Sequence, residues 1–386
     1  MNKNINKLLS LTLLGICAIS LSACENDPKS VKFTLQDPVS VDIHTEHQAA
    51  FLEDPNYNNI GKYSAFAEKE GYSVPAPILL QWKVTSAKSY VIKVSENSDM
   101  SNAMSYETAS KGKIFSFYNA KLNTKYYWTV TANYKSNSFT SEVASFTTKD
   151  TILRNIFVDG VDNVRDLGGY KTASNKVVKQ GLVYRSGQLN KDKVNDTEPL
   201  ATAEGLKVLN EQLKIKTDID LRKSVPGDDG KIENSGLNES PISKEAVYRS
   251  LPMYYDGQNM LEHSDPNKLE RNLQSVCEFF DILSDKSSYP VVFHCVQGKD
   301  RTGLLSYLLG ALLGESETDL YRDYLFTNFS TSVGSPCKSD DISKRYGLTI
   351  NKIEGSSLAE KTYNYLHNTL SIPTNTLDAV IDNLCE

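Results

Sequence analysis

The sequence is poor in cysteine and has no excess of positive charge. Its 386 residues include 6 cysteines, too few for a disulfide scaffold in so long a chain. Lys and Arg number 42 against 48 Asp and Glu, for a net charge of -6, so the basic surface of a nucleic-acid-binding protein is absent. Beyond the N-terminal segment, no run is long and apolar enough to cross a bilayer. The length favours two domains. Because the net charge is negative, any anion-binding pocket must be a local positive patch.

The first 24 residues have the pattern of a bacterial export signal. Two lysines precede an apolar stretch from Leu8 to Leu21. The run Leu-Ser-Ala-Cys that ends at Cys24 resembles a lipobox, which implies that this cysteine is lipidated and becomes the mature N-terminus. We therefore expect a lipoprotein of the bacterial cell envelope, periplasmic or surface-exposed, held in the membrane by acyl chains. An ordinary secretory signal is the alternative, and residues 25–30 are expected to be a polar tether.

Four cysteines remain in the mature chain after Cys24. One bridge among Cys277, Cys337 and Cys385 stays open, but separate buried thiols are the favoured interpretation. The fourth, Cys295, has a sequence context of its own that is described below.

Residues 31–149 have the pattern of β-strands. Leu80–Thr85 alternates between apolar and polar positions, and Tyr126–Ala132 repeats the period of two. The early tryptophan, the run Leu-x-x-x-Tyr-x-Trp-x-Val-x-Ala and a closing Phe-x-Thr resemble a fibronectin type III sandwich. This resemblance implies an all-β module that acts as a spacer or docking domain. Residues 46–73 do not fit it, and we expect a long surface insertion there.

The most informative segment is His294–Gly303. The apolar run Pro290–Phe293 before it predicts a buried strand, and the leucine-rich run Leu304–Leu313 after it predicts a buried helix. A cysteine at the end of a strand, a glycine-bearing loop and a helix that begins near Arg301 suit the binding of an oxyanion. Backbone N–H groups and the helix N-terminus favour negative charge there, and the guanidinium can hold two phosphate oxygens at once. The same positive field should lower the pKa of Cys295.

The run His-Cys-x-x-Gly-Lys-Asp-Arg-Thr-Gly resembles the phosphate loop of cysteine-dependent phosphatases, in particular the branch of bacterial secreted tyrosine and phosphoinositide phosphatases. Residues 150–386 are therefore expected to form an α/β, tyrosine phosphatase-like domain with a central, mostly parallel sheet flanked by helices. A fragment that begins near Asp150 should be active. Within the similar segment Asn163–Tyr170, Arg165 and Asp166 could be active-site groups, but a structural ion pair or turn contact for them is the favoured interpretation. Further segments that resemble the branch are Gly181–Leu189, Asp220–Arg222 and Asp323–Asn328.

The resemblance implies a role for each position of the loop. Cys295 is expected to attack phosphorus, while Arg301 and the loop amides hold the phosphate oxygens. Thr302 is expected to hydrogen-bond the sulfur, and His294 to orient the loop through backbone contacts. No His, Asp or Glu set has metal-ligand spacing, so no metal or other cofactor is expected. The positions expected to bind substrate are Val296, Gln297, Gly298, Lys299 and Thr302.

Two aspartates compete for the role of general acid. Asp300 lies beside Arg301, whose charge favours the ionised carboxylate and so suits a base or a structural partner. Asp256 lies in a segment that resembles the one carrying the movable acid in relatives. Closure of that segment would desolvate the carboxyl and raise its pKa. We therefore assign the acid to Asp256, and the reverse assignment to Asp300 is the alternative.

The function expected from the loop is hydrolysis of a phosphomonoester through a phosphocysteine. A phosphotyrosine protein is the favoured substrate, with activity on phosphoserine left open. A phosphoinositide or inositol phosphate is the alternative, because Lys299 adds a second cation unless it is an ordinary surface lysine. The other classes considered are a rhodanese-like sulfurtransferase and an inactive phospho-binding surface protein. No nucleic-acid partner is expected.

Overall fold

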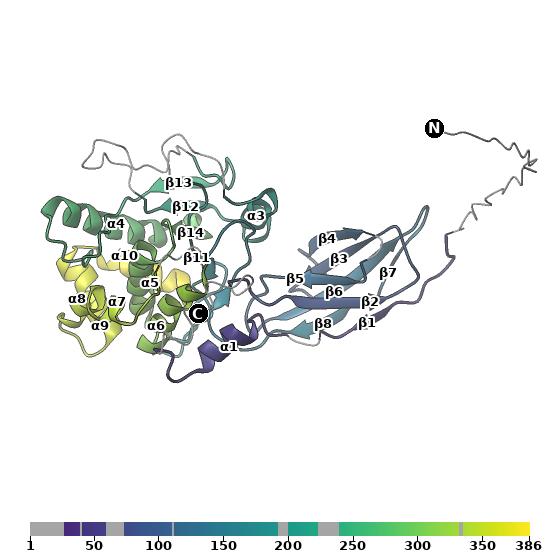
Figure 1. The fold of residues 1–386 in the computed structure, drawn as a ribbon, viewed down its shortest axis with the longest axis horizontal. Coiled ribbons are helices and arrows are strands. Elements are labelled where there is room, and N and C mark those ends of the chain that lie inside the picture. The colour runs from purple at the N-terminus through teal and green to yellow at the C-terminus, as the bar shows by residue number, and fades with distance from the viewer. Residues whose placement is uncertain are drawn as a thin grey trace, which may run out of the picture.

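The computed structural model describes residues 27–38, 41–58, 73–109, 112–191, 200–222, 239–331 and 335–386. Figure 1 shows two parts, an elongated β module and a helix-rich α/β body. The export signal, Cys24 and the start of the tether lie outside the described ranges. Within these ranges, no helix has the length and apolar character needed to span a membrane.

The β module consists of two antiparallel sheets around one core. The first has the strand order β1 (Thr34–Gln36), β2 (Ile78–Lys83) and β5 (Ile114–Phe117). The second has the order β4 (Met104–Ala109), β3 (Ser89–Ser95), β6 (Lys125–Asn133) and β7 (Ser138–Thr140), and β8 (Ala144–Thr147) also pairs with β6. The predicted alternation is confirmed, because alternate residues of β2 and β6, including Trp82 and Trp128, are buried in the shared core.

Part of the segment expected to be a surface insertion is a helix packed against the α/β body. Helix α1 spans Glu46–Glu53 and begins with a capping box formed by Thr45 and Gln48. Phe51 is 1% exposed and belongs to the core of the body. The surface interpretation is therefore wrong for α1, and residues 59–72 of the same segment lie outside the described ranges.

The α/β body is built on a mixed sheet with the strand order β13-β12-β14-β11-β10-β9. The strands from β13 to β11 pair in parallel, and β10 and β9 add an antiparallel edge, so the predicted mostly parallel sheet is confirmed. Strand β14 is buried at every position, as its apolar sequence predicts. The bounds are β9 Arg154–Asn155, β10 Arg165–Asp166, β11 Val183–Ser186, β12 Thr217–Asp220, β13 Val247–Ser250 and β14 Val291–His294.

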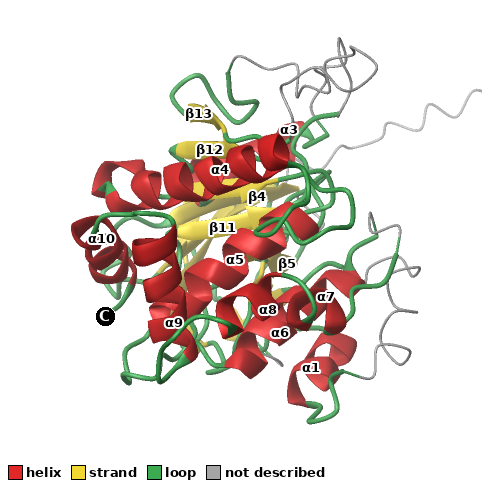
Figure 2. Cartoon of the chain, turned by 90° about the vertical axis from the view of Figure 1, so that its left-hand side faces the viewer, coloured by secondary structure: helices red, strands yellow, loops and turns green. Residues whose placement is uncertain are grey.

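Helices cover the sheet of the body (Figure 2). Helix α4 starts where Asp265 caps its N-terminus and Pro266 occupies its first turn. Helix α5 is buried over most of its length and ends at Gly314, which takes a left-handed φ of 86°. The described helices of the body are α3 (Ala203–Lys207, continued by the π-helical turn Val208–Gln212), α4 (Pro266–Ser284), α5 (Asp300–Leu313), α6 (Glu317–Phe326, continued by the 3-10 turn Thr327–Phe329), α7 (Asp340–Ser343), α8 (Tyr346–Asn351), α9 (Leu358–Asn364) and α10 (Thr374–Leu384).

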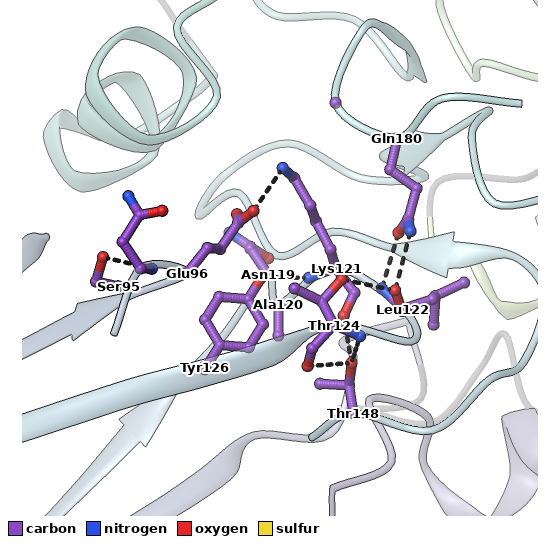
Figure 3. Close-up of polar contacts among 12 residues, drawn as sticks. Ser95, Glu96, Asn119, Ala120, Lys121, Leu122, Thr124, Tyr126, Thr148 and Gln180 are labelled. Atoms are coloured by element: carbon purple, nitrogen blue, oxygen red, sulfur yellow. Dashed lines mark hydrogen bonds and ion pairs between the residues drawn. The ribbon is translucent and has the colours of Figure 1, made fainter. Parts of the chain in front are cut away.

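Reciprocal amide contacts join the β module to the body. The side chain of Gln180 accepts from the backbone N–H of Leu122 at 2.8 Å and donates to its carbonyl at 3.0 Å (Figure 3). The side chain of Asn119 makes the same pair of bonds with the backbone of Phe157, at 2.7 and 3.0 Å. Buried Arg154 of β9 donates to the carbonyl of Asn119 at 2.5 Å. These bonds fix the module directly onto the body.

Candidate active site

The predicted strand, glycine loop and helix are confirmed around Cys295. The cysteine follows β14 and is 3% exposed, and α5 begins at Asp300. Gly298 has a φ of 65°, and a Cβ there would stand 2.5 Å from the carbonyl oxygen of Ser186, so only glycine fits. The loop therefore brings the sulfur close to the N-terminus of a buried helix, where an anion is favoured.

The surroundings of Cys295 favour its thiolate. Burial alone raises the pKa of the thiol. The charge of Arg301 and the hydrogen bonds from the hydroxyl and backbone N–H of Thr302 outweigh burial, so the pKa of Cys295 lies below its ordinary value. The Thr302 hydroxyl has no other hydrogen-bond partner among the described residues. Among the same residues, the Arg301 guanidinium bonds only the carbonyl of Leu221, at 3.3 Å. Most of its fork is thus open to an oxyanion.

Side chains of the body hold the phosphate loop from behind. Asn163 Nδ2 donates to the carbonyls of Gln297 and Gly298, at 2.9 and 3.2 Å. Arg185 Nη2 donates to the same carbonyl of Gly298 at 2.6 Å. These donors occupy carbonyl oxygens that would otherwise repel a bound phosphate, and they fix the path of the loop.

Asp323 of α6 ties together the arginines behind the loop. One carboxylate oxygen accepts from Arg165 Nε at 2.9 Å and the other accepts from Arg185 Nη1. Burial raises the pKa of Asp323, but the two guanidinium groups outweigh burial and leave its pKa below the ordinary value. The structural ion pair predicted for Arg165 is confirmed, and Asp166 makes its own buried pair with Arg154 at 2.7 Å. Sequence reasoning gave no role to Arg185 or Asp323, although both lie in segments that resemble the phosphatase branch.

His294 contacts a side chain of the neighbouring strand β12. Its Nε2 lies 3.0 Å from Asp218 Oδ1, whereas backbone contacts were expected. Burial lowers the pKa of His294, but Asp220 and Asp218 outweigh burial and raise its pKa. Arg222 in turn bonds Asp220 through Nε and Nη2, and the pKa of Asp220 falls to about 2 because that pairing and His294 outweigh burial. The polar end of β12 therefore supports the start of the loop.

Asp256 lies on an exposed loop and is paired with other residues. Its Oδ2 is 3.0 Å from His263 Nε2 and 3.2 Å from Lys268 Nζ. Burial raises the pKa of Asp256, but the hydrogen bonds from these two partners together outweigh burial and lower it. None of these described contacts is with the phosphate loop, so the structure does not bring Asp256 to Cys295.

Asp300 has the opposite environment. It is the first residue of α5, and one side-chain oxygen has no hydrogen-bond partner among the described residues. Burial raises the pKa of Asp300 above its ordinary value, although Lys299, the Tyr255 hydroxyl and Arg345 oppose this effect. Arg345 Nη1 stands 3.8 Å from Asp300. The expectation that Arg301 would hold this carboxyl ionised is wrong, because burial dominates.

The predicted substrate-binding residues lie together in the loop and the first turn of α5. Val296, Gln297 and Gly298 form the loop, and Thr302 faces the sulfur. Lys299 is 6% exposed, and its amine donates to the carbonyl and hydroxyl of Ser335 at 3.0 and 3.2 Å. The alternative of a solvated surface lysine is therefore wrong. The cysteines described outside the loop, Cys277, Cys337 and Cys385, are free thiols, as favoured.

The chain belongs to the tyrosine phosphatase family. The model of that family matches residues 156–386, more than half of the sequence. A protein of Cupriavidus necator, provisionally named a tyrosine-protein phosphatase, is 27% identical over 186 residues, which are 44% of this chain and 62% of that relative. The chain thus spans about three fifths of the length of this relative.

Solved structures with partial similarity are also known. The core catalytic domain of the PP-IP phosphatase SIW14 from S. cerevisiae is 19% identical, with a TM-score of 0.27, and the match covers 48% of this chain and 93% of that one. TpbA of P. aeruginosa is 16% identical, with a TM-score of 0.28, and the match covers 48% and 88% of the two chains.

Proposed function

We propose that the protein hydrolyses phosphomonoesters through a phosphocysteine and acts as a tyrosine phosphatase-like enzyme. The observation that carries this proposal is a buried cysteine with a lowered pKa at the start of a loop that leads to Arg301, whose guanidinium bonds only the carbonyl of Leu221 among the described residues. A thiolate in that position can attack phosphorus in line, while the guanidinium and the helix N-terminus stabilise the oxygens of the transition state. Membership of the tyrosine phosphatase family supports the same chemistry.

In the first step the Cys295 sulfur forms a bond to phosphorus as the bond from phosphorus to the leaving oxygen breaks. The leaving oxygen takes a proton, and we now assign its donor to Asp300 because burial raises the pKa of that carboxyl. In the second step water attacks phosphorus, its proton passes to the ionised Asp300, and the sulfur leaves as a thiolate. The Thr302 hydroxyl stabilises that thiolate. Asp256 remains the alternative donor if its loop closes over bound substrate.

The favoured substrate is a phosphotyrosine protein, in line with the family match and the name of the C. necator relative. A phosphoinositide or inositol phosphate is the second candidate. The cation that favours it is Arg345, whereas Lys299 was the cation expected from the sequence. Arg345 lies beside Asp300 and Tyr255 with 24% of its side chain exposed, and could pair with a second phosphate. Turnover on matched panels of phosphotyrosine peptides, phosphoserine peptides, phosphoinositides and inositol phosphates tests the choice.

Substitution of the nucleophile tests the phosphocysteine mechanism. Cys295→Ser is expected to abolish hydrolysis of para-nitrophenyl phosphate with the fold retained, because a serine alkoxide is not accessible near neutral pH. Comparable turnover by that variant would contradict the mechanism. Sulfur transfer from thiosulfate by the wild type, without phosphate hydrolysis, would point to a sulfurtransferase. Phosphopeptide binding with neither reaction would indicate an inactive binding protein.

We infer further that the protein is an envelope lipoprotein with a fibronectin type III-like module. The run that ends at Cys24 supports the lipid anchor, and the pair of antiparallel sheets over residues 34–147 supports the module. Cys24→Ser should release the protein from the membrane fraction, because one lipidated residue supplies the anchor. Membrane association that is unchanged in the variant would count against the lipobox.

A further inference from the structure

Helix α1 places an aromatic side chain of the N-terminal half inside the α/β body. The ring of Phe51 meets Phe326 edge-on with centroids 6.2 Å apart, and it meets Phe329 at 5.7 Å. Both partners lie in α6 or the 3-10 turn that continues it. Figures 1 and 2 both show α1 against this corner of the body. Edge-on aromatic contacts in a buried cluster hold the partner rings in a defined place.

A second set of contacts ties α6 to the turn that follows α1. Arg322 Nη2 donates to the carbonyl of Asp54 at 3.3 Å. The same guanidinium stacks on the ring of Tyr57, with its Cζ 5.0 Å from the ring centroid. Residues 46–57 therefore hold α6 through packing on one side and through a charged group on the other.

Helix α6 and its 3-10 turn contact both α1 and the side chains behind the phosphate loop. Phe326 and Phe329 face α1, whereas Asp323 and Thr327, which lie between or beside them in the sequence, bond the arginines behind the loop. Asp323 pairs with Arg185, whose other arm donates to the carbonyl of Gly298. Thr327 accepts from Arg165, and the Arg165 guanidinium lies over the ring of Phe326 at 5.6 Å. A continuous path of buried contacts therefore runs from α1 to the loop. Every step of that path is a packed or hydrogen-bonded side chain.

We propose that Phe51 is a positioning residue for the phosphate loop, so that the N-terminal half is a component of the catalytic unit. This inference rests on the proposed phosphatase function. The residues matched by the tyrosine phosphatase family begin at 156, so Phe51, which would support the loop, lies outside the family region. Loss of the ring would leave a cavity beside Phe326 and Phe329 and let α6 shift. The expectation that a fragment from Asp150 would be active is replaced by its opposite.

The test compares two phenylalanines of equal burial in the full chain. Phe117, also 1% exposed, packs against Tyr126 and Phe146 in the β module and does not belong to the core of the body. Phe51→Ala, the milder Phe51→Leu and the control Phe117→Ala are each measured at a temperature where circular dichroism shows them folded. The readouts are kcat and KM on para-nitrophenyl phosphate. A further readout is the pH dependence of Cys295 alkylation by iodoacetamide, followed by mass spectrometry of its peptide.

Phe51→Ala is expected to lower kcat by roughly ten- to a hundredfold, because small displacements of catalytic groups cost about that much. The pKa of the Cys295 thiol should rise in this variant, Phe51→Leu should recover part of both values, and Phe117→Ala should change neither. If Phe51→Ala does not fold, Phe51→Leu decides. Wild-type kcat and thiol pKa in the Phe51 variants, or equal losses in Phe117→Ala, would overturn the inference. A wild type inactive on every phosphate would refute the phosphatase function alone, and the alkylation profiles would still decide the role of Phe51.

Discussion

The back and the mouth of the phosphate loop differ in burial and in the way their charges are paired. At the back, Arg165, Arg185 and Asp323 are buried and bonded to one another and to the loop. The mouth consists of Asp300, Arg345 and the segment with Tyr255 and Asp256. Arg345 is half-buried beside Asp300 and bonds Tyr255, whereas Asp256 is exposed and bonds His263 rather than the loop. We therefore propose that the back fixes the geometry of phosphate binding, whereas proton transfer and substrate choice depend on the mouth.

The largest expected difference between the back and the mouth is in stability, and it is tested by replacing Asp323. Asp323→Asn leaves two buried guanidinium groups without their carboxylate and should lower the free energy of unfolding by about 3–5 kcal/mol. Asp256→Asn at the exposed mouth should change it by less than about 0.5 kcal/mol. Urea denaturation of both variants measures the difference. Equal and small losses would mean that the back does not fix the loop.

The proposed role of the mouth in proton transfer is tested by finding which aspartate is the general acid. Asp300→Asn should slow esters with poor leaving groups by about 10²-fold or more and esters with good leaving groups much less, because good ones depart unprotonated. Asp256→Asn should show no such dependence if its pairing with His263 and Lys268 persists during turnover. The measurement is kcat/KM across aryl phosphates of graded leaving-group pKa. A steep dependence for Asp256→Asn alone would reverse the assignment.

The smallest expected effect is on the pH dependence of stability, which should change in opposite directions when the two aspartates are replaced. The raised pKa of Asp300 stabilises the fold below the pKa of the unfolded chain, and this contribution is lost as pH rises through the folded pKa. The lowered pKa of Asp256 gives a contribution that is present above the unfolded pKa and lost as pH falls. Relative to wild type, Asp300→Asn should therefore gain stability as pH rises from mild acid to neutral. Asp256→Asn should instead lose stability as pH rises through the acid range below the ordinary aspartate pKa of 3.8. Thermal unfolding at the two ends of each pH range gives the sign for each variant, and equal signs would contradict the environments described.

Local patterns predicted much of the fold and the centre of the site. The strand before Cys295, the loop glycine and the buried helix after it follow from residues adjacent in the sequence, and so do the alternating strands of the β module. The ion pair of Arg165 was also predicted, although its partner was not.

What the sequence did not show depends on residues brought together from distant segments. The pKa direction of Asp300 depends on burial by the fold, which outweighs the adjacent positive charges that sequence reasoning could see. The loop of Asp256 resembled an acid-bearing segment, but its pairing with His263 is a feature of the folded loop. The place of α1 depends on Phe326 and Phe329, so no local pattern around Phe51 could predict it.

The contact between α1 and α6 has a consequence for the order in which the chain can fold. Arg322 and Asp54 are 268 positions apart, so α1 is synthesised long before the residues that bury it. At roughly 5–20 residues per second, the interval is on the order of tens of seconds. During that time the β module can complete its own core, but Phe51 cannot yet pack against Phe326 and Phe329 and remains accessible to a chaperone or to another nascent chain. Completion of the N-terminal half therefore depends on arrival of α6, late in synthesis.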